Sequence, residues 1–214
     1  MTEFLHFVLP HLPAPPARVL EVGCGPEGGL TQALADAGFD VLGIDPRAPD
    51  GPLFRRVTLE ELDDPGPFAA VVASRVLHHV SPLGPALDKL ARLAPLLLLD
   101  EFAPELIDEP TREWYEAQHR LLTAAGVDPP GPPDLARWRE AHTNLHPSHL
   151  LLEELAPRYE TRHLERRPYL YRWLGGPASE ALERAVADAV AIRAVGFRYA
   201  GVRTETTPPS AAAR

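Results

Sequence analysis

The chain has 214 residues, 45% of them hydrophobic, and a formal net charge of −9 at pH 7. This length suits one α/β domain with an elaboration and is short for two full domains. A negative net charge argues against nucleic acid as the main partner, because duplex binding needs a basic surface. The single cysteine, Cys24, excludes an intramolecular disulfide, which is consistent with a reducing compartment.

Membrane insertion is not indicated by the apolar segments. The longest uninterrupted apolar stretch lies around residues 93–99 and is far shorter than the roughly 20 residues that a transmembrane helix needs. Near the N-terminus, Glu3 stands where a signal peptide would be basic, and Pro10 interrupts the apolar run. We therefore expect a cytoplasmic protein that binds neither membranes nor nucleic acid.

The first elements in the chain predict a βαβ unit. Residues 18–22 are typical of a buried strand, and residues 23–29 can only form a glycine-rich loop. Apolar residues then recur at helical spacing as far as Gly38, a natural residue at which to end a helix. Residues 40–45 predict a second strand, so the sheet should be parallel with helices on its faces. The link to a weak strand at residues 54–58 is too short for a normal crossover helix, and we expect a loop or single turn there.

The alternation of strand and helix continues through residue 100. Residues 68–73 predict a buried strand, and residues 96–99 predict the next one. Between them, Ser81 caps a helix that has Pro82 at its first position and ends before Pro95.

After residue 102 the pattern becomes mainly helical. We expect a helical insertion over about residues 103–145, a single domain over residues 1–205 and a disordered tail at residues 206–214. The elements expected in this half are helices at 111–125 and 135–142 and from Pro147, strands at 159–164 and 169–173, an amphipathic helix that ends at Gly196, and a last strand at 197–204.

The glycine loop and the acidic residue after the second strand point to a ligand. Glycines let a ligand approach the backbone closely because no Cβ intervenes, and the loop directs the N-terminus of the next helix toward that ligand. Asp45 lies 20 residues after Gly25, where a carboxylate can accept hydrogen bonds from both ribose hydroxyls of an adenosine. The pattern predicts an adenosine-bearing cofactor. The alternative is a tight turn followed by a surface aspartate.

A nicotinamide cofactor is one possibility for this site. Gly23, Gly25 and Gly28 fit the G-x-G-x-x-G pattern of nicotinamide-dependent oxidoreductases. Glu21 opposes that reading, because a carboxylate two residues before the first glycine repels an anionic pyrophosphate. The chain also lacks a Tyr-x-x-x-Lys pair, since Lys89 is its only lysine.

The segment from Val19 to Gly25, Val-Leu-Glu-Val-Gly-Cys-Gly, resembles the first motif of class I S-adenosylmethionine-dependent methyltransferases, which carry an acidic residue at the position of Glu21. Residues 68–79, residues 96–101 and the segment that starts at Leu145 resemble later parts of the same family, in the same order. The resemblance covers residues 16–100 and 145–205. It is closest to enzymes that methylate small molecules, such as the ubiquinone and natural-product types.

This resemblance implies a Rossmann-like, seven-stranded, mostly parallel sheet with helices on both faces, an antiparallel last strand and a helical insertion after the fifth strand. It implies methyl transfer from S-adenosylmethionine to an oxygen, nitrogen or carbon of a small molecule. A non-catalytic protein that binds the cofactor remains an alternative. The positions that match the cofactor-binding residues of the family are Glu21, Gly23, Gly25, Asp45, Leu59 and Ser74.

The catalytic and acceptor-binding residues are less sharply indicated. A general base is needed only if the acceptor atom is protonated before the reaction. Each candidate base has a structural alternative, such as capping a strand end or packing on the sheet, and each candidate aromatic residue can equally hold the insertion on the sheet. The candidate bases are His78, His79, Glu101, His119 and His146, and the candidate acceptor-binding residues are Arg75, Trp114, Tyr115 and Tyr169.

A metal site is not expected. Three histidines, His142, His146 and His149, lie near one another in sequence, but their spacing is loose and Pro147 falls between them. No thiol or carboxylate completes a ligand set. The oligomeric state is not indicated by the sequence.

Overall fold

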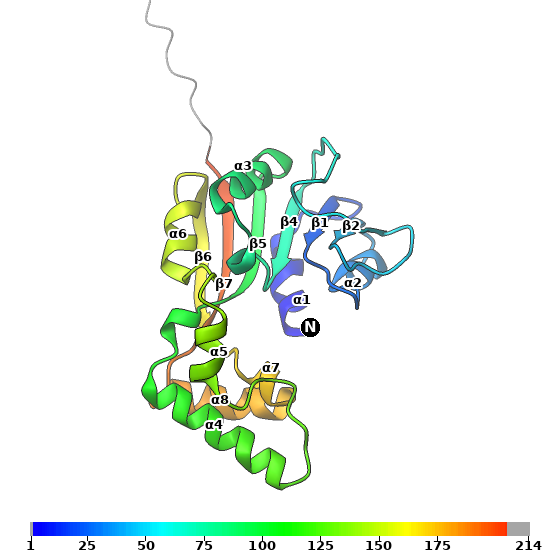
Figure 1. Cartoon of the computed structure of the whole chain (residues 1–214). Coiled ribbons are helices and arrows are strands. Elements are labelled where there is room, and N and C mark those ends of the chain that lie inside the picture. The colour runs from blue at the N-terminus through cyan, green and yellow to red at the C-terminus, as the bar shows by residue number, and fades with distance from the viewer. Residues whose placement is uncertain (1, 205–214) are drawn as a thin grey trace, which may run out of the picture.

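A computed structural model of the chain describes residues 2–204, and the predicted tail at residues 206–214 lies outside them (Figure 1). Seven strands form one sheet in the order β3-β2-β1-β4-β5-β7-β6. The first five strands pair in parallel, while β7 runs antiparallel between β5 and β6. The strands are β1 (Arg18–Val22), β2 (Asp40–Ile44), β3 (Phe54–Arg55), β4 (Ala70–Ser74), β5 (Leu96–Phe102), β6 (Tyr159–Arg167) and β7 (Gly196–Arg203). The expected fold class is confirmed.

Helices cover both faces of this sheet. The helices α1 (Thr2–Val8) and α2 (Thr31–Asp36) pack on one face, and α3 (Leu83–Leu93) and α6 (Ser148–Leu155) pack on the other. The remaining helices gather in a lobe beyond the ends of the strands, at the bottom of Figure 1. They are α4 (Glu109–Ala124), α5 (Leu135–Ala141), α7 (Tyr171–Leu174) and α8 (Pro177–Asp188).

Alternate side chains of the central strands enter two different cores. On β4 and β5, Val71 and Leu97 pack with α3 and α6, whereas Val72 and Leu98 pack with α1 and α2. Successive side chains of a strand point to opposite faces, so a strand covered on both faces must be apolar at nearly every position. This requirement explains the apolar runs by which the sequence indicated both strands.

An aromatic cluster joins the helical lobe to the end of β5. The ring of Phe102 stacks on the ring of Tyr169, with 4.1 Å between the centroids, and Trp138 and Trp173 pack around the pair. Tyr115 of α4 completes the cluster and is fully buried. The lobe is therefore assembled from the predicted insertion, which supplies α4 and α5, and from α7 and α8, which follow β6. The single domain over residues 1–205 stays a prediction.

The elements agree with the sequence except at four places. Ser81 does not cap α3, because Pro82 is extended and stands just before the helix, and no side chain caps it. The amphipathic helix expected to end at Gly196 ends at Asp188, shortly before Val190 adopts a φ of +58°.

As expected, no helix forms between β2 and β3, and the strand near residue 54 is only two residues long. The apolar N-terminal run, for which the sequence indicated no element, forms α1. The strand expected at residues 169–173 is wrong, because the chain turns into α7 at Tyr171.

The carboxylate of Glu183 explains why α7 begins where it does. Glu183 lies on α8 and is fully buried. Its two oxygens accept hydrogen bonds from the backbone amides of Tyr169, Leu170 and Tyr171, at 2.6–3.1 Å. The first amides of a helix have no partner within the helix, so a carboxylate at this point stabilises the helical start. The alternation of side chains in the sequence carries no trace of this distant partner.

We expect Glu183→Ala to lower the free energy of unfolding by about 3 kcal/mol or more, because it leaves three buried amides unsatisfied. Urea unfolding followed by circular dichroism measures the change. Glu153→Ala, on the exposed side of α6, is the matched control and should change stability by less than about 0.5 kcal/mol. Equal stability of the two variants would contradict this role for Glu183.

Candidate functional site

The loop after β1 is held by a buried carboxylate. Glu21 accepts hydrogen bonds from the amide of Leu30, at 2.8 and 2.9 Å, and from the hydroxyl of Thr31, at 2.7 Å. Burial raises the pKa of Glu21, and the hydrogen bonds from Thr31 and Leu30 oppose that shift. The carboxylate therefore ties the start of α2 back to β1 and fixes the path of the loop between them.

Three glycines in this loop have distinct structural reasons. Gly29 has φ +55°, and a Cβ there would lie 2.2 Å from Oε1 of Glu21, so only glycine allows the carboxylate to come this close. Gly25 has φ +66°, and a Cβ there would meet no atom within 4 Å. At the other end of the loop, a Cβ on Gly23 would lie 2.8 Å from the side chain of Val76. The loop is thus packed tightly at both ends and borders open space in its middle, where a ligand can lie against the backbone.

Asp45 follows β2 and borders a small pocket of about 270 Å³. Its Oδ1 accepts a hydrogen bond from the amide of Arg47 at 2.7 Å, and its side chain is 12% exposed. The pocket wall also contains Gly23, Leu59 and apolar side chains such as Val76. A hydrogen-bonding carboxylate beside an apolar slot suits a sugar with an attached flat ring.

A larger pocket of about 630 Å³ lies beside the small one, and Gly23 borders both. Glu21 of β1 and Cys24 of the loop border it, together with Ser74 at the end of β4 and Arg75 directly after it. Residues from α1, α7, α8, β5 and β7 complete the wall. Both pockets therefore open at the same edge of the sheet, where the parallel strands end.

Strand register explains how the larger pocket crosses the sheet. Ser74 of β4 pairs with Asp100 of β5, which pairs in turn with Arg198 of β7. Val22 of β1 pairs with Ala73 of β4, so the residues that follow them, Gly23 and Ser74, lie at the same level of the sheet. Neighbouring strands are about 4.8 Å apart, so Gly23 and Arg198 stand at two ends of a row about 14 Å long.

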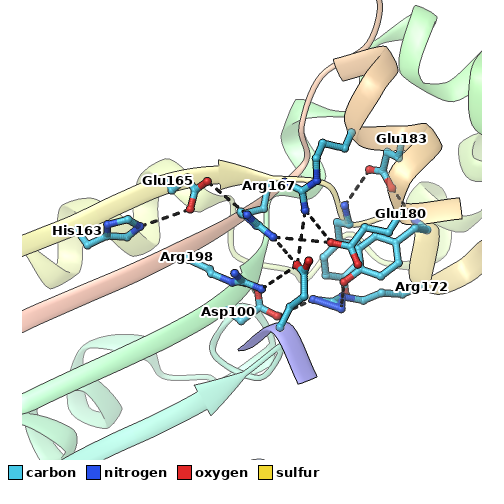
Figure 2. A network of polar contacts seen from close by, with 12 residues as sticks. Asp100, His163, Glu165, Arg167, Arg172, Glu180, Glu183 and Arg198 are labelled. Carbon is cyan, nitrogen blue, oxygen red and sulfur yellow. Dashed lines mark hydrogen bonds and ion pairs between the residues drawn. The ribbon is translucent and has the colours of Figure 1, made fainter. Parts of the chain in front are cut away.

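The far end of this row is strongly charged. Figure 2 shows Asp100 between Arg172 and Arg198, with Glu180 of α8 nearby. A terminal guanidinium nitrogen of Arg172 lies 2.6 Å from Asp100, and Arg198 approaches the same carboxylate at 3.7 Å. Glu3 of α1 enters the group from the other side.

Two of the candidate bases are bonded to each other and to backbone. Oε1 of Glu101 accepts hydrogen bonds from the amides of Val76 and Leu77, at 2.9 and 2.7 Å. Oε2 of Glu101 lies 2.6 Å from Nδ1 of His78, and both side chains are buried. Neither residue borders the two pockets, so the geometry favours the structural alternative for both.

The other three candidate histidines are dispersed. His79 borders the smaller pocket, and burial, followed by the charge of His78, lowers the pKa of His79. Nε2 of His119 lies 3.1 Å from the carbonyl of Gly131 in the lobe. Nε2 of His146 lies 2.7 Å from the carbonyl of Val80. None of the three borders the larger pocket.

Of the candidate acceptor-binding residues, only Arg75 borders the larger pocket. Tyr115 is fully buried, and its hydroxyl donates a hydrogen bond to the carbonyl of Pro132 at 2.8 Å. Trp114 packs against the aromatic cluster, to which Tyr169 also belongs. The geometry favours the packing alternative for these three aromatic residues.

Sequence reasoning missed several residues that border the larger pocket. Tyr171 and Arg172 were hidden by the incorrect strand, which placed them on opposite faces of a sheet. Arg198 faces the pocket only because β7 runs antiparallel beside Asp100, and the sequence gives no register. The missed residues are Glu3, Phe4, Asp100, Tyr171, Arg172, Glu180, Arg184 and Arg198.

Cys24 borders the larger pocket but is buried. Burial, with smaller contributions from the charges of Glu21 and Asp45, raises the pKa of the Cys24 thiol to about 12. The thiol is therefore protonated at neutral pH and is a poor nucleophile. Over residues 2–204, no three or more His, Cys, Asp or Glu side chains come together as metal ligands would. Within the same range, no helix has the length and apolar character that crossing a membrane requires.

Residues 1–156 match the family described as "Methyltransferase domain", and no curated protein matches the chain. Among solved structures, an S-adenosylmethionine dependent methyltransferase from Mesorhizobium loti is similar, with a TM-score of 0.58 and 16% identity, over 94% of this chain and 95% of that one.

Two further structures are similar and contain ligands. The 1,6-didemethyltoxoflavin-N1-methyltransferase of Burkholderia thailandensis, with bound 1,6-didemethyltoxoflavin and S-adenosylhomocysteine, has a TM-score of 0.52 and 19% identity, over 89% of this chain and 72% of that one. The geranyl diphosphate C-methyltransferase of Streptomyces coelicolor A3(2), in complex with Mg²⁺, geranyl diphosphate and S-adenosyl-L-homocysteine, has a TM-score of 0.58 and 14% identity, over 95% of this chain and 79% of that one. At these identities the likeness establishes the fold.

Glu101→Ala distinguishes a structural role from a catalytic one. We expect it to lower the free energy of unfolding by about 3 kcal/mol or more, because it leaves the buried ring of His78 without its partner and two amides without an acceptor. Urea unfolding measures the change in stability. Glu105→Ala is unsuitable as a control, because the Glu105 carboxylate accepts a hydrogen bond from Ser148. Glu160→Ala on exposed β6 serves instead. If Glu101→Ala is as stable as the wild type, the structural role is wrong and Glu101 is again a candidate catalytic base.

Proposed function

The chain belongs to the methyltransferase domain family, and on that premise we propose that it transfers a methyl group from S-adenosylmethionine to a small-molecule acceptor. The observation that carries this proposal is the pair of adjoining pockets that share Gly23. We assign the smaller pocket to the adenosine part of the cofactor, and the larger pocket to its methionine part together with the acceptor.

The residues present fit S-adenosylmethionine. Asp45 offers a carboxylate to the ribose hydroxyls, and Leu59 lies in the wall of the apolar slot that would hold adenine. The open space beside Gly25 leaves room for the methionine part against the backbone. Ser74, in the wall of the larger pocket, offers its carbonyl to the cofactor's ammonium group.

Glu21 argues against the nicotinamide alternative. In dinucleotide-binding folds, the pyrophosphate binds the amides at the N-terminus of the helix after the glycine loop. Here the carboxylate of Glu21 already accepts hydrogen bonds from Leu30 and Thr31 at that point, and it would repel a pyrophosphate. A cofactor without phosphate is compatible with this arrangement.

The bound cofactor supplies an electrophilic methyl carbon on a sulfonium. The protein has to orient an acceptor atom in line with that carbon and exclude water from the reaction. Phe4 of α1 and Tyr171 of α7 border the larger pocket from outside the sheet, and we propose that they cover the acceptor. Arg75 borders the same space.

We propose that positioning, and not proton removal by histidine, is the main contribution to catalysis. No histidine of the described residues borders the larger pocket. The acceptor atom should then be nucleophilic at neutral pH without a histidine base, as an unprotonated nitrogen or a thiolate is. A base role for His79 or His146 would require the loops that hold them to move.

Two observations bear on the remaining alternatives. A volume of about 630 Å³ lies in the range of pockets that enclose small ligands, so it favours an enzyme over a protein that only binds cofactor. The charge of −9 supports a small-molecule acceptor and not nucleic acid, and the single buried cysteine supports a cytoplasmic location.

Asp45→Ala tests the cofactor assignment. We expect it to weaken S-adenosylhomocysteine binding by about 1.5–3 kcal/mol, because it removes charge-assisted hydrogen bonds to the ribose. Isothermal titration calorimetry measures the change. Asp50→Ala, a nearby and almost fully exposed carboxylate, is the matched control and should bind as the wild type does. Unchanged affinity in Asp45→Ala would show that the ribose binds elsewhere.

Methyl transfer itself is tested with methyl-labelled S-adenosylmethionine and the small-molecule fraction of a cell extract. We expect label to enter a low-molecular-weight product in the presence of the wild-type protein, and much less of it with Asp45→Ala. Tight binding of S-adenosylhomocysteine without any labelled product across extracts would instead support the non-catalytic alternative.

A further inference from the structure

Arg198 of β7 is the most unusual charged residue of the larger pocket. It borders the pocket although only 7% of its surface is exposed. Its Nε atom is buried and has no hydrogen-bond partner within residues 2–204. Its two terminal nitrogens make no hydrogen bond within residues 2–204 either, so the guanidinium in the pocket wall keeps donors that a ligand can engage.

The carboxylates near Arg198 do not supply the missing hydrogen bonds. Asp100 approaches its Nε at 3.7 Å, and Glu3 approaches a terminal nitrogen at 3.6 Å. Both distances exceed the usual 2.7–3.2 Å for a hydrogen bond of this type. Burial, followed by the neighbouring charge of Arg167, lowers the pKa of Arg198, although the charges of Asp100 and Glu3 oppose this shift.

Arg172 places a second guanidinium in the same wall of the pocket. Its terminal nitrogens donate hydrogen bonds to the Tyr171 hydroxyl and to Asp100, both at 2.6 Å, so the guanidinium is held in place. Its Nε is nevertheless buried without a partner among the described residues. Figure 2 shows Arg172 and Arg198 on either side of Asp100.

We propose that Arg198, together with Arg172, binds an anionic group of the methyl acceptor, of the carboxylate type, at the end of the larger pocket opposite the glycine loop. Arginine suits this task, because its planar fork of donors matches a carboxylate. The inference rests on the proposed function and narrows its acceptors to small organic acids.

The cofactor has a carboxylate of its own, but position argues against it as the occupant. Its carboxylate shares a carbon with the ammonium group that we place on Ser74, and Ser74 stands two strands, about 10 Å, from Arg198 along the row, with β5 between them. In this arrangement the acceptor lies beyond the methyl group, over Asp100, between the cofactor and Arg198.

Glu3 of α1 stands where it would compete with such an anion. It contacts Arg167 and lies 3.5 Å from Arg184 and 3.6 Å from Arg198, although about half of its side chain is exposed. Glu180 lies beside it, and the pKa of Glu180 is raised by burial and by Glu3. Removing the charge of Glu3 should therefore make the arginines more available to a ligand.

Benzoate and its neutral analogue benzamide are suitable probes for this site. Each is titrated by calorimetry into the protein saturated with S-adenosylhomocysteine. We expect benzoate to bind at least about tenfold more tightly than benzamide, since hydrogen bonds to charged groups are worth about 1.5–3 kcal/mol. Arg198→Gln should abolish this preference, and Arg172→Gln should reduce it.

Two further variants separate a binding role from general damage. Glu3→Gln should strengthen benzoate binding, whereas a structural defect at this site would weaken it. Arg162→Gln, an exposed arginine on β6 paired with Glu160, is the matched control and should bind benzoate as the wild type does.

Three results would overturn the inference. The first is equal binding of benzoate and benzamide by the wild type. The second is benzoate binding that Arg198→Gln and Arg172→Gln both leave unchanged. The third is a loss of S-adenosylhomocysteine affinity in Arg198→Gln with unchanged affinity for 5′-methylthioadenosine. Because 5′-methylthioadenosine lacks the amino-acid part, this result would show that Arg198 binds the amino-acid part of the cofactor. If the wild type binds no S-adenosylhomocysteine at all, the proposed function itself fails and the inference fails with it.

Discussion

The hydrogen bonds from the start of α2 to the buried carboxylate of Glu21 are the interaction on which the site depends. They draw the helix start toward β1 and leave the middle of the loop, at Gly25, next to open space. They also place a negative charge where a dinucleotide would need its phosphates to bind. One side chain thus shapes the proposed cofactor site and, in our proposal, disfavours a cofactor that carries phosphate.

Two other buried glutamates act in the same way on the rest of the wall. Glu101 binds the amides of Val76 and Leu77 and so fixes the segment after β4, which borders both pockets. Glu183 binds the amides at the start of α7, which carries Tyr171 and Arg172 into the larger pocket. Irregular segments have few packing constraints of their own, and a buried carboxylate that accepts several amides supplies the missing rigidity.

The sequence predicts those features that depend on neighbours along the chain. The apolar runs, the glycine loop and the position of Asp45 are local patterns, and they predict a parallel sheet with helices on its faces. The seven-stranded arrangement with an antiparallel last strand came from the resemblance to a known family. The pocket beyond Gly23 depends on contacts between distant segments: Glu183 converts an alternating stretch into a helix, and strand register brings Arg198 beside Asp100. For Glu101 the sequence leaves a base and a structural role equally open, because its partners, the amides of Val76 and Leu77 and the ring of His78, come from a distant segment.

A crystal structure of the protein with S-adenosylhomocysteine is the most direct test of the two-pocket arrangement. It should show the ribose hydroxyls on Asp45, the sulfur beyond Gly23 toward Ser74, and Glu21 still bonded to Leu30. Adenosine bound outside the Asp45 pocket, or a Glu21 side chain displaced from the loop by the ligand, would contradict the arrangement.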